Sequence, residues 1–232
     1  LSLRRQRQMC IRDRFMIDTI GMTDIGNGRP SNQDAYLLRQ KEKNGKLYLL
    51  AVVCDGMGGL KKGEIASHYI VEVLKQWFDE TLFDGLETMG IDMIEQNLID
   101  LIRRINQNLL LMSRRMEETK SMGSTLTLLF VEEHEFFVLN VGDSRTYWFD
   151  RDRKFVTTDH TLAELELRAG HLTKEQAKKD PRRHILIQCV GVTKDIRIDC
   201  YKGRLNPGME FLLCTDGFYG PVSYTHLTLP TK

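Results

Sequence analysis

Cysteine is scarce in this sequence, long apolar runs are absent, and neither sign of charge dominates. The five cysteines include no Cys-x-x-Cys pair, which argues against a disulfide framework or a zinc ribbon and indicates reduced thiols in a cytosolic protein. The longest apolar runs, residues 47–54 and 126–131, are too short to span a membrane. With 41% apolar residues and no low-complexity stretch, the 232-residue chain is instead long enough for one domain with a sizeable core.

The two ends differ from the rest of the chain. Residues 1–14 hold five Arg and one Asp without periodicity, a pattern typical of a basic nucleic-acid arm or a targeting peptide. The genetic code offers a third interpretation, because residues 222–226 can be encoded as GTC TCT TAT ACA CAT. The reverse complement, ATG TGT ATA AGA GAC, encodes residues 9–13. We therefore interpret 1–14 and 222–232 as non-native, adapter-like segments and exclude them from the fold.

This exclusion changes the charge balance. The remaining chain has 27 basic and 31 acidic residues, a net charge of −4. The apparent basic arm disappears, and with it the case for nucleic-acid binding. We expect no nucleic-acid partner and no membrane segment.

Strand and helix patterns alternate along residues 15–221 without a linker. The expected strands are residues 47–54, 124–131, 135–141, 145–149, 155–157, 185–190, 196–201 and 210–214. The expected helices are residues 63–83, 93–116, 161–169 and 174–179. The first helix has one apolar face, made of Ile65, Tyr69, Val73, Trp77 and Phe78. Together these patterns predict an α+β fold, an antiparallel β-sandwich flanked by helices in α-β-β-α layers.

Four Asp residues stand where a predicted strand meets a turn. Asp55, Asp143 and Asp216 each follow such a strand, and Asp34 precedes the short strand pattern 35–38. A carboxylate at the mouth of a buried strand is rigidly held yet faces solvent, and Gly56 offers an unhindered carbonyl. An all-oxygen set of this kind suits Mg²⁺ or Mn²⁺ rather than zinc. Each Asp-Gly pair taken alone is also typical of an ordinary turn, and spacing does not show that the four carboxylates converge.

Two other catalytic patterns fit less well. The glycine-rich loop from Gly56 to Gly63 lacks both the ending of a P-loop and the third glycine of a dinucleotide fingerprint. The triplet 142–144, Gly-Asp-Ser, is similar to the nucleophilic serine block of GDSL esterases, but Arg145 and a strand follow it. Three residues near these motifs are interpreted as surface or capping groups: Lys61, Lys62 and His160.

Six short blocks occur in the order found in the metal-dependent Ser/Thr protein phosphatases of the 2C type. They are RPSNQDA, VVCDGMGG followed by GEIAS, GSTLTLLFV, NVGDSRTYWF, TTDHTLAELELRAG and FLLCTDGFYG. Each block is weak evidence alone, but together they make residues 21–220 resemble this family. Met57 resembles the bacterial branch, because many eukaryotic members have at that position a His that is proposed as general acid.

The resemblance implies a site for two Mg²⁺ or Mn²⁺ ions, with a third, weaker position. Asp55 matches the Asp that bridges two metals, and Gly56 matches a carbonyl ligand of one of them. Asp216 matches a ligand of the second metal, and Asp143 a ligand of the third. A metal-activated water would then attack phosphorus in line, without a covalent phosphoenzyme.

Two further matches concern water and phosphate. Asp34 matches an acid that holds metal-bound waters, so it is counted with both the metal-site and the catalytic residues. Arg29 matches the substrate-binding Arg, whose planar fork grips two phosphate oxygens. The resemblance therefore assigns catalysis to Asp55, Arg29 and Asp34.

One departure from the family concerns the end of the chain. The family's last metal-ligand Asp lies in an Asp-Asn segment downstream of the block that contains Asp216, and the sequence ends before it. The last strands of one sheet would be missing as well, which exposes unpaired edges. We therefore expect residues 15–221 to be a truncated catalytic domain that binds metal poorly and is inactive or unstable, whereas the intact parent is a phosphatase.

The function implied is hydrolysis of phosphoserine and phosphothreonine on proteins by a cytoplasmic, monomeric enzyme whose substrates come from a Ser/Thr kinase. The alternative is a catalytically silent regulatory or binding module of the same fold. Retention of the motif residues argues against it: Arg29, Asp34, Asp55, Asp143 and Asp216. A third hypothesis makes the substrate a phosphorylated regulator of sporulation or stress sigma factors, as for relatives of this fold.

Overall fold

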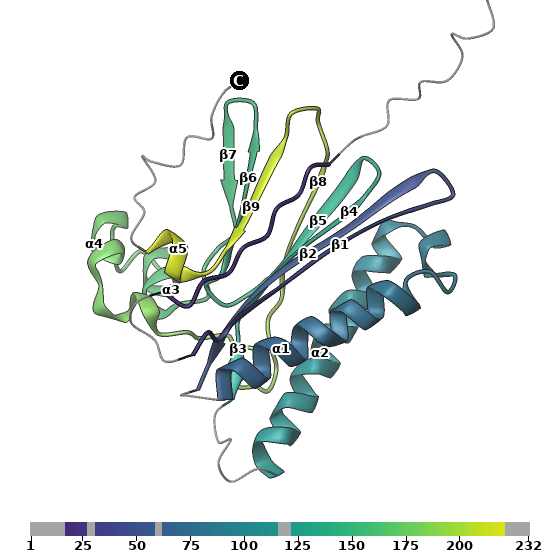
Figure 1. Cartoon of the computed structure of the whole chain (residues 1–232). Coiled ribbons are helices and arrows are strands. Elements are labelled where there is room, and N and C mark those ends of the chain that lie inside the picture. Colours follow the sequence, from purple (N-terminus) through teal and green to yellow (C-terminus); the bar gives the residue numbers. More distant parts are fainter. Residues whose placement is uncertain (1–16, 27–30, 59–61, 116–121, 221–232) are drawn as a thin grey trace, which may run out of the picture.

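The computed structural model describes residues 17–26, 31–58, 62–115 and 122–220. Arg29 and the adapter-like segments 1–14 and 222–232 lie outside the described residues. Two antiparallel sheets packed face to face form the centre of the molecule, and two long helices lie on one side of them (Figure 1).

The first sheet has the strand order β1-β2-β4-β5-β8, and β3 pairs with the end of β2. Its strands are β1 (Asp34–Lys43), β2 (Lys46–Met57), β3 (Gly123–Ser124), β4 (Leu126–Glu132), β5 (Glu135–Val141) and β8 (Asp199–Arg204). The β1–β2 hairpin turns at Asn44 and Gly45, which both have positive φ, as the Asn-Gly pair of a type I′ turn requires.

The second sheet has the order β7-β6-β9. Its strands are β6 (Arg145–Asp150), β7 (Arg153–Val156) and β9 (Glu210–Cys214). The core between the two sheets is apolar and partly aromatic, with Phe136 of the first sheet packed edge-on against Trp148 and Phe211 of the second. Burial of these large rings holds the two sheets together.

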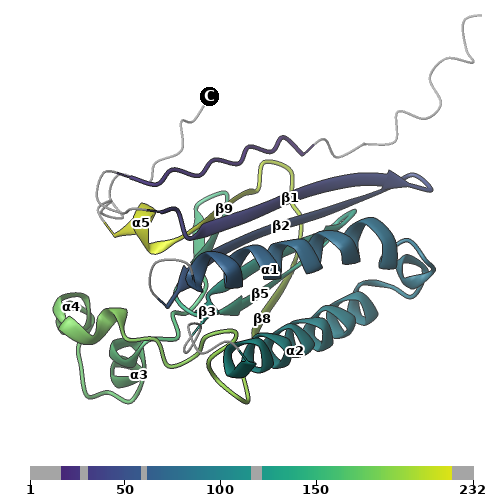
Figure 2. The same ribbon diagram turned by 60° about the horizontal axis from the view of Figure 1, so that its bottom comes forward.

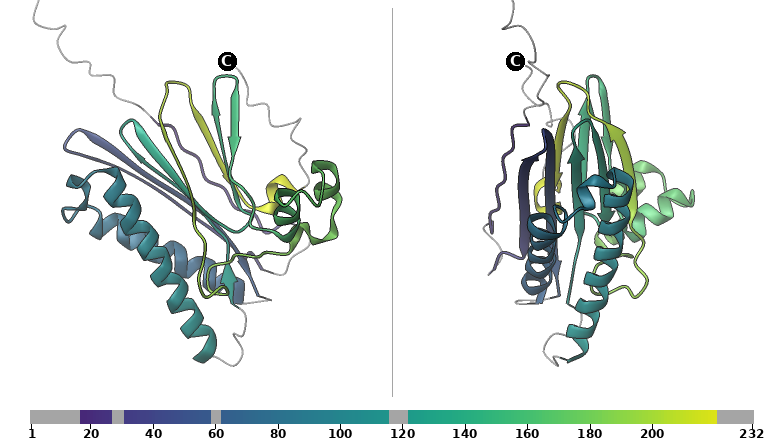
Figure 3. Two further views of the ribbon diagram at one scale, coloured as in Figure 1. Left: turned by 180° about the vertical axis from the view of Figure 1, so that it is seen from behind. Right: turned by 90° about the vertical axis from the view of Figure 1, so that its right-hand side faces the viewer.

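Helices α1 (Lys62–Gln76) and α2 (Ile91–Arg115) lie side by side on the outer face of the first sheet (Figures 2 and 3). Between them the chain forms a π-helical turn, Trp77–Thr81, and a 3-10 turn, Leu86–Thr88. The helices and the sheet share one core, in which Ile70, Leu98 and Phe130 have no exposed surface.

The short helices gather at one end of the sheets (Figure 1). They are α3 (Leu162–Arg168), α4 (Lys174–Lys179), the 3-10 turn Pro181–His184 and α5 (Asp216–Tyr219). The expected α+β fold of antiparallel sheets flanked by helices is confirmed. Among the described residues, the long helices form one layer and the two sheets form two more. None of the helices in these ranges is long and apolar enough to cross a membrane.

The expected strand over 185–190 is wrong. Leu186 forms an isolated bridge with Thr161, and Val190 forms another with Ser124. The segment is therefore held at its two ends by different partners and cannot join a single ladder. Ile185 is half exposed for the same reason.

The expected apolar face of α1 departs from expectation mainly at its first residue, since Trp77 and Phe78 are buried as expected. Ala66, Ile70 and Leu74 have no exposed surface, whereas Ile65 is 36% exposed. Small residues on the buried side allow the helix backbone to approach the sheet closely, which large residues would prevent.

Candidate metal centre

Four elements bring the predicted carboxylates to one end of the sandwich. Asp34 is the first residue of β1, and the β1–β2 register places it directly opposite Asp55. Asp143 lies in the turn between β5 and β6, and Asp216 begins α5 just after β9. The expected turn is present at Asp143, whereas at Asp216 the one-turn helix α5 takes its place. At Asp55 the turn is absent, because β2 continues to Met57.

A cavity of about 280 Å³ lies where these elements meet. Asp55, Gly56, Asp143 and Asp216 all contribute to its lining. The carboxylate of Asp34 is tied to the same region differently.

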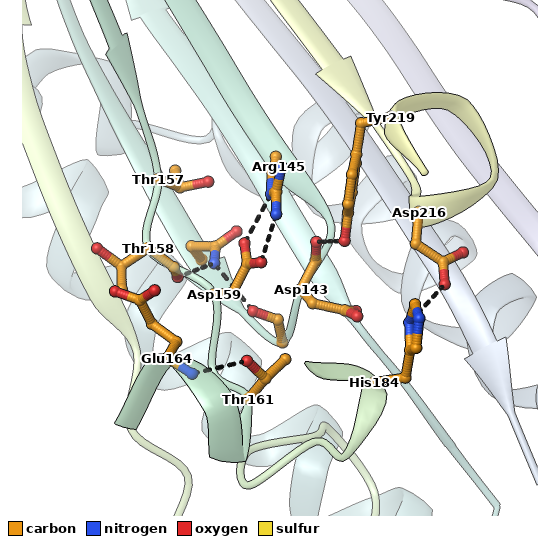
Figure 4. Close-up of polar contacts among 12 residues, drawn as sticks. Asp143, Arg145, Thr157, Thr158, Asp159, Thr161, Glu164, His184, Asp216 and Tyr219 are labelled. Carbon is orange, nitrogen blue, oxygen red and sulfur yellow. Dashed lines mark hydrogen bonds and ion pairs between the residues drawn. The ribbon is translucent and has the colours of Figure 1, made fainter. Parts of the chain in front are cut away.

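The hydroxyl of Thr215 donates to Asp34 Oδ2 at 2.9 Å, immediately before Asp216 in the chain. On the other side of Asp216, His184 Nδ1 lies 3.9 Å from its Oδ2 (Figure 4). The structure therefore places four predicted metal-site residues on one cavity and joins the fifth, Asp34, to the residue before Asp216. Arg29 lies outside the described residues.

Burial and crowding of like charges change the acidity of two of these groups. Burial, followed by the charges of Asp34, Asp216 and Asp143, raises the pKa of Asp55 to about 8. Burial, followed by the charges of Asp159 and Asp216, raises the pKa of Asp143 to about 7. Carboxylates that repel one another in this way are stabilised by a cation placed among them.

The donors present fit a hard divalent cation. They are carboxylate oxygens and a backbone carbonyl, which Mg²⁺ and Mn²⁺ prefer. In the described part of the chain no three His, Cys, Asp or Glu side chains converge closely enough to form a finished cage. The carboxylates border a common cavity without closing around a point in it. A positive ion bound there would relieve the repulsion that raises the pKa values of Asp55 and Asp143.

The backbone of Asp55 is held by Ser124, the last residue of β3, and by Thr125 next to it. Thr125 Oγ1 accepts from the Asp55 N–H at 2.9 Å, and the Thr125 N–H donates to the Asp55 carbonyl at 2.9 Å. Ser124 Oγ donates to the same carbonyl at 3.0 Å. Thr125 Oγ1 also lies 2.6 Å from Ser144 Oγ, next to Asp143. One buried hydroxyl thus joins the two carboxylate-bearing segments.

Replacing Thr125 with Val is expected to lower the free energy of unfolding by about 1–3 kcal/mol, because the buried Asp55 N–H loses its acceptor. Urea unfolding measures the change. Ser113→Ala is the control, since the buried Ser113 hydroxyl has no hydrogen-bond partner among the described residues. Its removal should change the free energy by less than about 0.5 kcal/mol. Equal effects of the two substitutions would contradict the role given to Thr125.

Of two residues near Asp143, His160 differs from expectation, and Ser144 agrees with the rejection of an esterase site. His160, expected at the surface or as a cap, is 4% exposed. Its Nδ1 accepts from the Gly142 N–H at 3.3 Å, and its Nε2 lies 3.3 Å from Asp199 Oδ2. Ser144 has no exposed surface, so it cannot act as the nucleophile of an esterase. The residues before His160 are polar, so the sequence does not predict that the side chain of His160 is buried.

The comparisons with known proteins identify the family to which the chain belongs. The family model described as "Protein phosphatase 2C" matches residues 20–230. Its last residues reach into 222–232, so the adapter-like origin of that segment stays a prediction.

Individual relatives match over most of their length. A serine/threonine phosphatase stp from Listeria innocua is 31% identical over 197 residues, which are 84% of this chain and 75% of the relative. The protein phosphatase PhpP of Streptococcus pneumoniae is 29% identical, covering 87% of this chain and 79% of the relative.

The crystal structure of serine/threonine phosphatase Stp1 from Staphylococcus aureus superimposes with a TM-score of 0.78 at 32% identity. The match covers 88% of this chain and 78% of that one. The family model matches nearly all of the sequence, a relative is 31% identical over most of its length, and a solved structure has the same fold. The chain therefore belongs to the protein phosphatase 2C family.

Proposed function

We propose that this protein hydrolyses phosphoserine and phosphothreonine on other proteins with divalent metal ions bound at the carboxylate-lined cavity. The observation that carries the proposal is the meeting of Asp55, Asp143 and Asp216 from three separate elements at one cavity, with Asp34 opposite Asp55. Carboxylates crowded in this way repel one another, and a divalent cation bound among them relieves the repulsion.

The roles of the residues follow from their positions. The Asp55 carboxylate and the Gly56 carbonyl would hold one ion, and Asp55 would share a second with Asp216. Asp143, at the edge of the cavity, would hold a third and weaker one. When bound, such ions supply Lewis acidity and an activated water. Asp34, whose Oδ2 accepts from the Thr215 hydroxyl, would direct water toward the cavity.

The substrate phosphate requires a positively charged side chain to bind it. The described residues that line the cavity include neither Lys nor Arg. We assign this role to Arg29, whose guanidinium can bind two phosphate oxygens at once. Mg²⁺ and Mn²⁺ suit the same oxygen donors, so both are candidate ions.

Three further proposals concern the catalytic domain, the cellular location and the partners of the enzyme. Residues 15–221 would form the catalytic domain. The reduced thiols and the absence of long apolar runs support a cytoplasmic location. We further propose that the protein acts as a monomer on the products of a Ser/Thr kinase.

Metal removal tests the proposal. For the protein produced from the source gene, we expect phosphate release from a phosphothreonine peptide in millimolar Mn²⁺, and a fall to the background rate when a chelator is added. Excess Mn²⁺ should restore the rate, because the chelator removes the ion without changing the fold.

The assay is run on this chain and on the protein produced from the source gene, which lacks the two end segments. A folded protein from that gene that binds Mn²⁺ but releases no phosphate would favour the silent regulatory module. Full turnover by residues 15–221 alone would contradict the expected impairment of this chain.

A further inference from the structure

Tyr219 connects the helix that begins with Asp216 to the turn that contains Asp143. It lies three residues after Asp216, and its hydroxyl donates to the Asp143 backbone carbonyl at 2.9 Å (Figure 4). The two carboxylates come from segments more than 70 residues apart in sequence. This hydrogen bond fixes the backbone of one relative to the helix of the other.

The ring of Tyr219 is itself held from the side. The guanidinium carbon of Arg145 lies 3.7 Å from the ring centre. Arg145 donates through Nε and Nη2 to the two oxygens of Asp159, at 2.8 and 2.6 Å. This fork-to-fork pairing fixes the plane of the guanidinium, and a fixed plane allows one stacking position for the ring.

The pairing also limits what Arg145 can contribute as a charge. Its positive charge and the negative charge of Asp159 act on Asp143 in opposite directions. What remains is placement: the Arg145–Asp159 pair and Tyr219 form a rigid support behind the cavity. Helix α5 has four residues, too few to be stable alone, so its position depends on such tertiary contacts.

We propose that Tyr219 is a positioning residue that sets the spacing between the Asp143 and Asp216 carboxylates, with Arg145 and Asp159 holding its ring in place. The inference rests on the proposed function, since the spacing matters only if the two carboxylates serve ions in the same cavity. A shift of a few tenths of an ångström at either carboxylate would weaken ion binding and leave the folded core intact.

The test is Tyr219→Phe, which keeps the ring against Arg145 and removes only the hydrogen bond to Asp143. The matched control is Tyr147→Phe. Tyr147 is buried, and its hydroxyl accepts from Arg145 Nη1 at 3.0 Å. Both substitutions remove a tyrosine hydroxyl close to Arg145, but only Tyr219→Phe removes a hydrogen bond to Asp143.

Because residues 15–221 alone are expected to bind metal poorly, the parent for this test is the protein produced from the source gene. Its Mn²⁺ binding is measured by titration calorimetry, and thermal unfolding is followed in chelator. We expect the dissociation constant for Mn²⁺ to rise about fivefold to tenfold in Tyr219→Phe, the effect of losing one hydrogen bond. The control should stay within about twofold of the parent. Both variants should unfold within a few degrees of it. In chelator, hydrogen exchange at the amides of residues 142–144 should be faster in Tyr219→Phe alone.

The outcomes separate the inference from the function on which it rests. A parent chain that takes up no Mn²⁺ overturns the metal site and the inference together. A parent that binds Mn²⁺, with unchanged affinity and exchange in Tyr219→Phe, overturns the inference only. Equal weakening in both variants also overturns it, because the loss would then follow general destabilisation around Arg145.

Discussion

In the protein produced from the source gene, replacing Asp55 with Asn is expected to abolish phosphatase activity and, at the same time, to make the metal-free protein more stable. The carboxylate faces Asp34 across the β1–β2 pair and Asp143 and Asp216 across the cavity. Asn has the same shape and no charge, so the repulsion is relieved and its amide can donate to a neighbouring carboxylate. A loss of at least about 1000-fold in turnover is expected where a bridging ligand is removed, about 4 kcal/mol of barrier.

The pH dependence of stability provides a second measure of the same repulsion. Because the folded protein holds protons on Asp55 and Asp143 to higher pH than the unfolded chain does, the cation-free parent should lose stability as pH rises. The loss begins near the ordinary carboxyl range and is complete at about pH 8 for Asp55. In Asp55→Asn the slope over this interval should be shallower.

Thermal unfolding with and without Mn²⁺ measures both effects. Mn²⁺ should raise the midpoint of the parent and leave that of Asp55→Asn nearly unchanged. Asp100→Asn is the control, since Asp100 is exposed on α2 and pairs only weakly with Arg103. It should retain both the Mn²⁺ effect and the pH slope. A full Mn²⁺ shift in Asp55→Asn would show that the ion binds elsewhere.

Much of the local structure could be predicted because its signals are local. The capping Thr173 and the Asp-Pro stop at Asp180 fix α4, and the bounds of β9 also match the expectation. Both segments have a clear period and clear boundaries. The strand expected at 185–190 has the same apolar composition, but its fate depends on Thr161 and Ser124, which are distant in sequence.

The site was predictable as a set of residues and not as an arrangement. Each Asp could be identified from the strand and turn around it, but the register that sets Asp34 against Asp55 depends on the hairpin between them. The support behind Asp143 was missed for a similar reason. Arg145 lies on a predicted strand beside buried aromatic residues, and a charge there requires a buried partner. Which residue provides that partner is decided by the tertiary fold.

Gly63 is the position where sequence propensity and structure predict opposite effects of the same substitution. Gly63→Ala lies at the second residue of α1, where propensity alone favours Ala by up to about 1 kcal/mol. In the structure, an added Cβ would lie 2.5 Å from the Gly56 carbonyl carbon and oxygen and 2.7 Å from the Met57 nitrogen. All three are backbone atoms of a paired strand, which cannot move aside as a side chain can.

We therefore expect Gly63→Ala to lower the free energy of unfolding by about 3 kcal/mol, since overpacking against a rigid backbone exceeds the gain in propensity. The displaced backbone carries Asp55, so Mn²⁺ affinity should fall as well. Gly217→Ala is the matched control: it is also the second residue of a helix, and its added Cβ would meet only Thr215 Oγ1, at 3.8 Å. Urea unfolding should place it within about 1 kcal/mol of the parent. If Gly63→Ala were as stable as this control, the close approach of α1 to β2 would not be what holds Asp55 at the cavity.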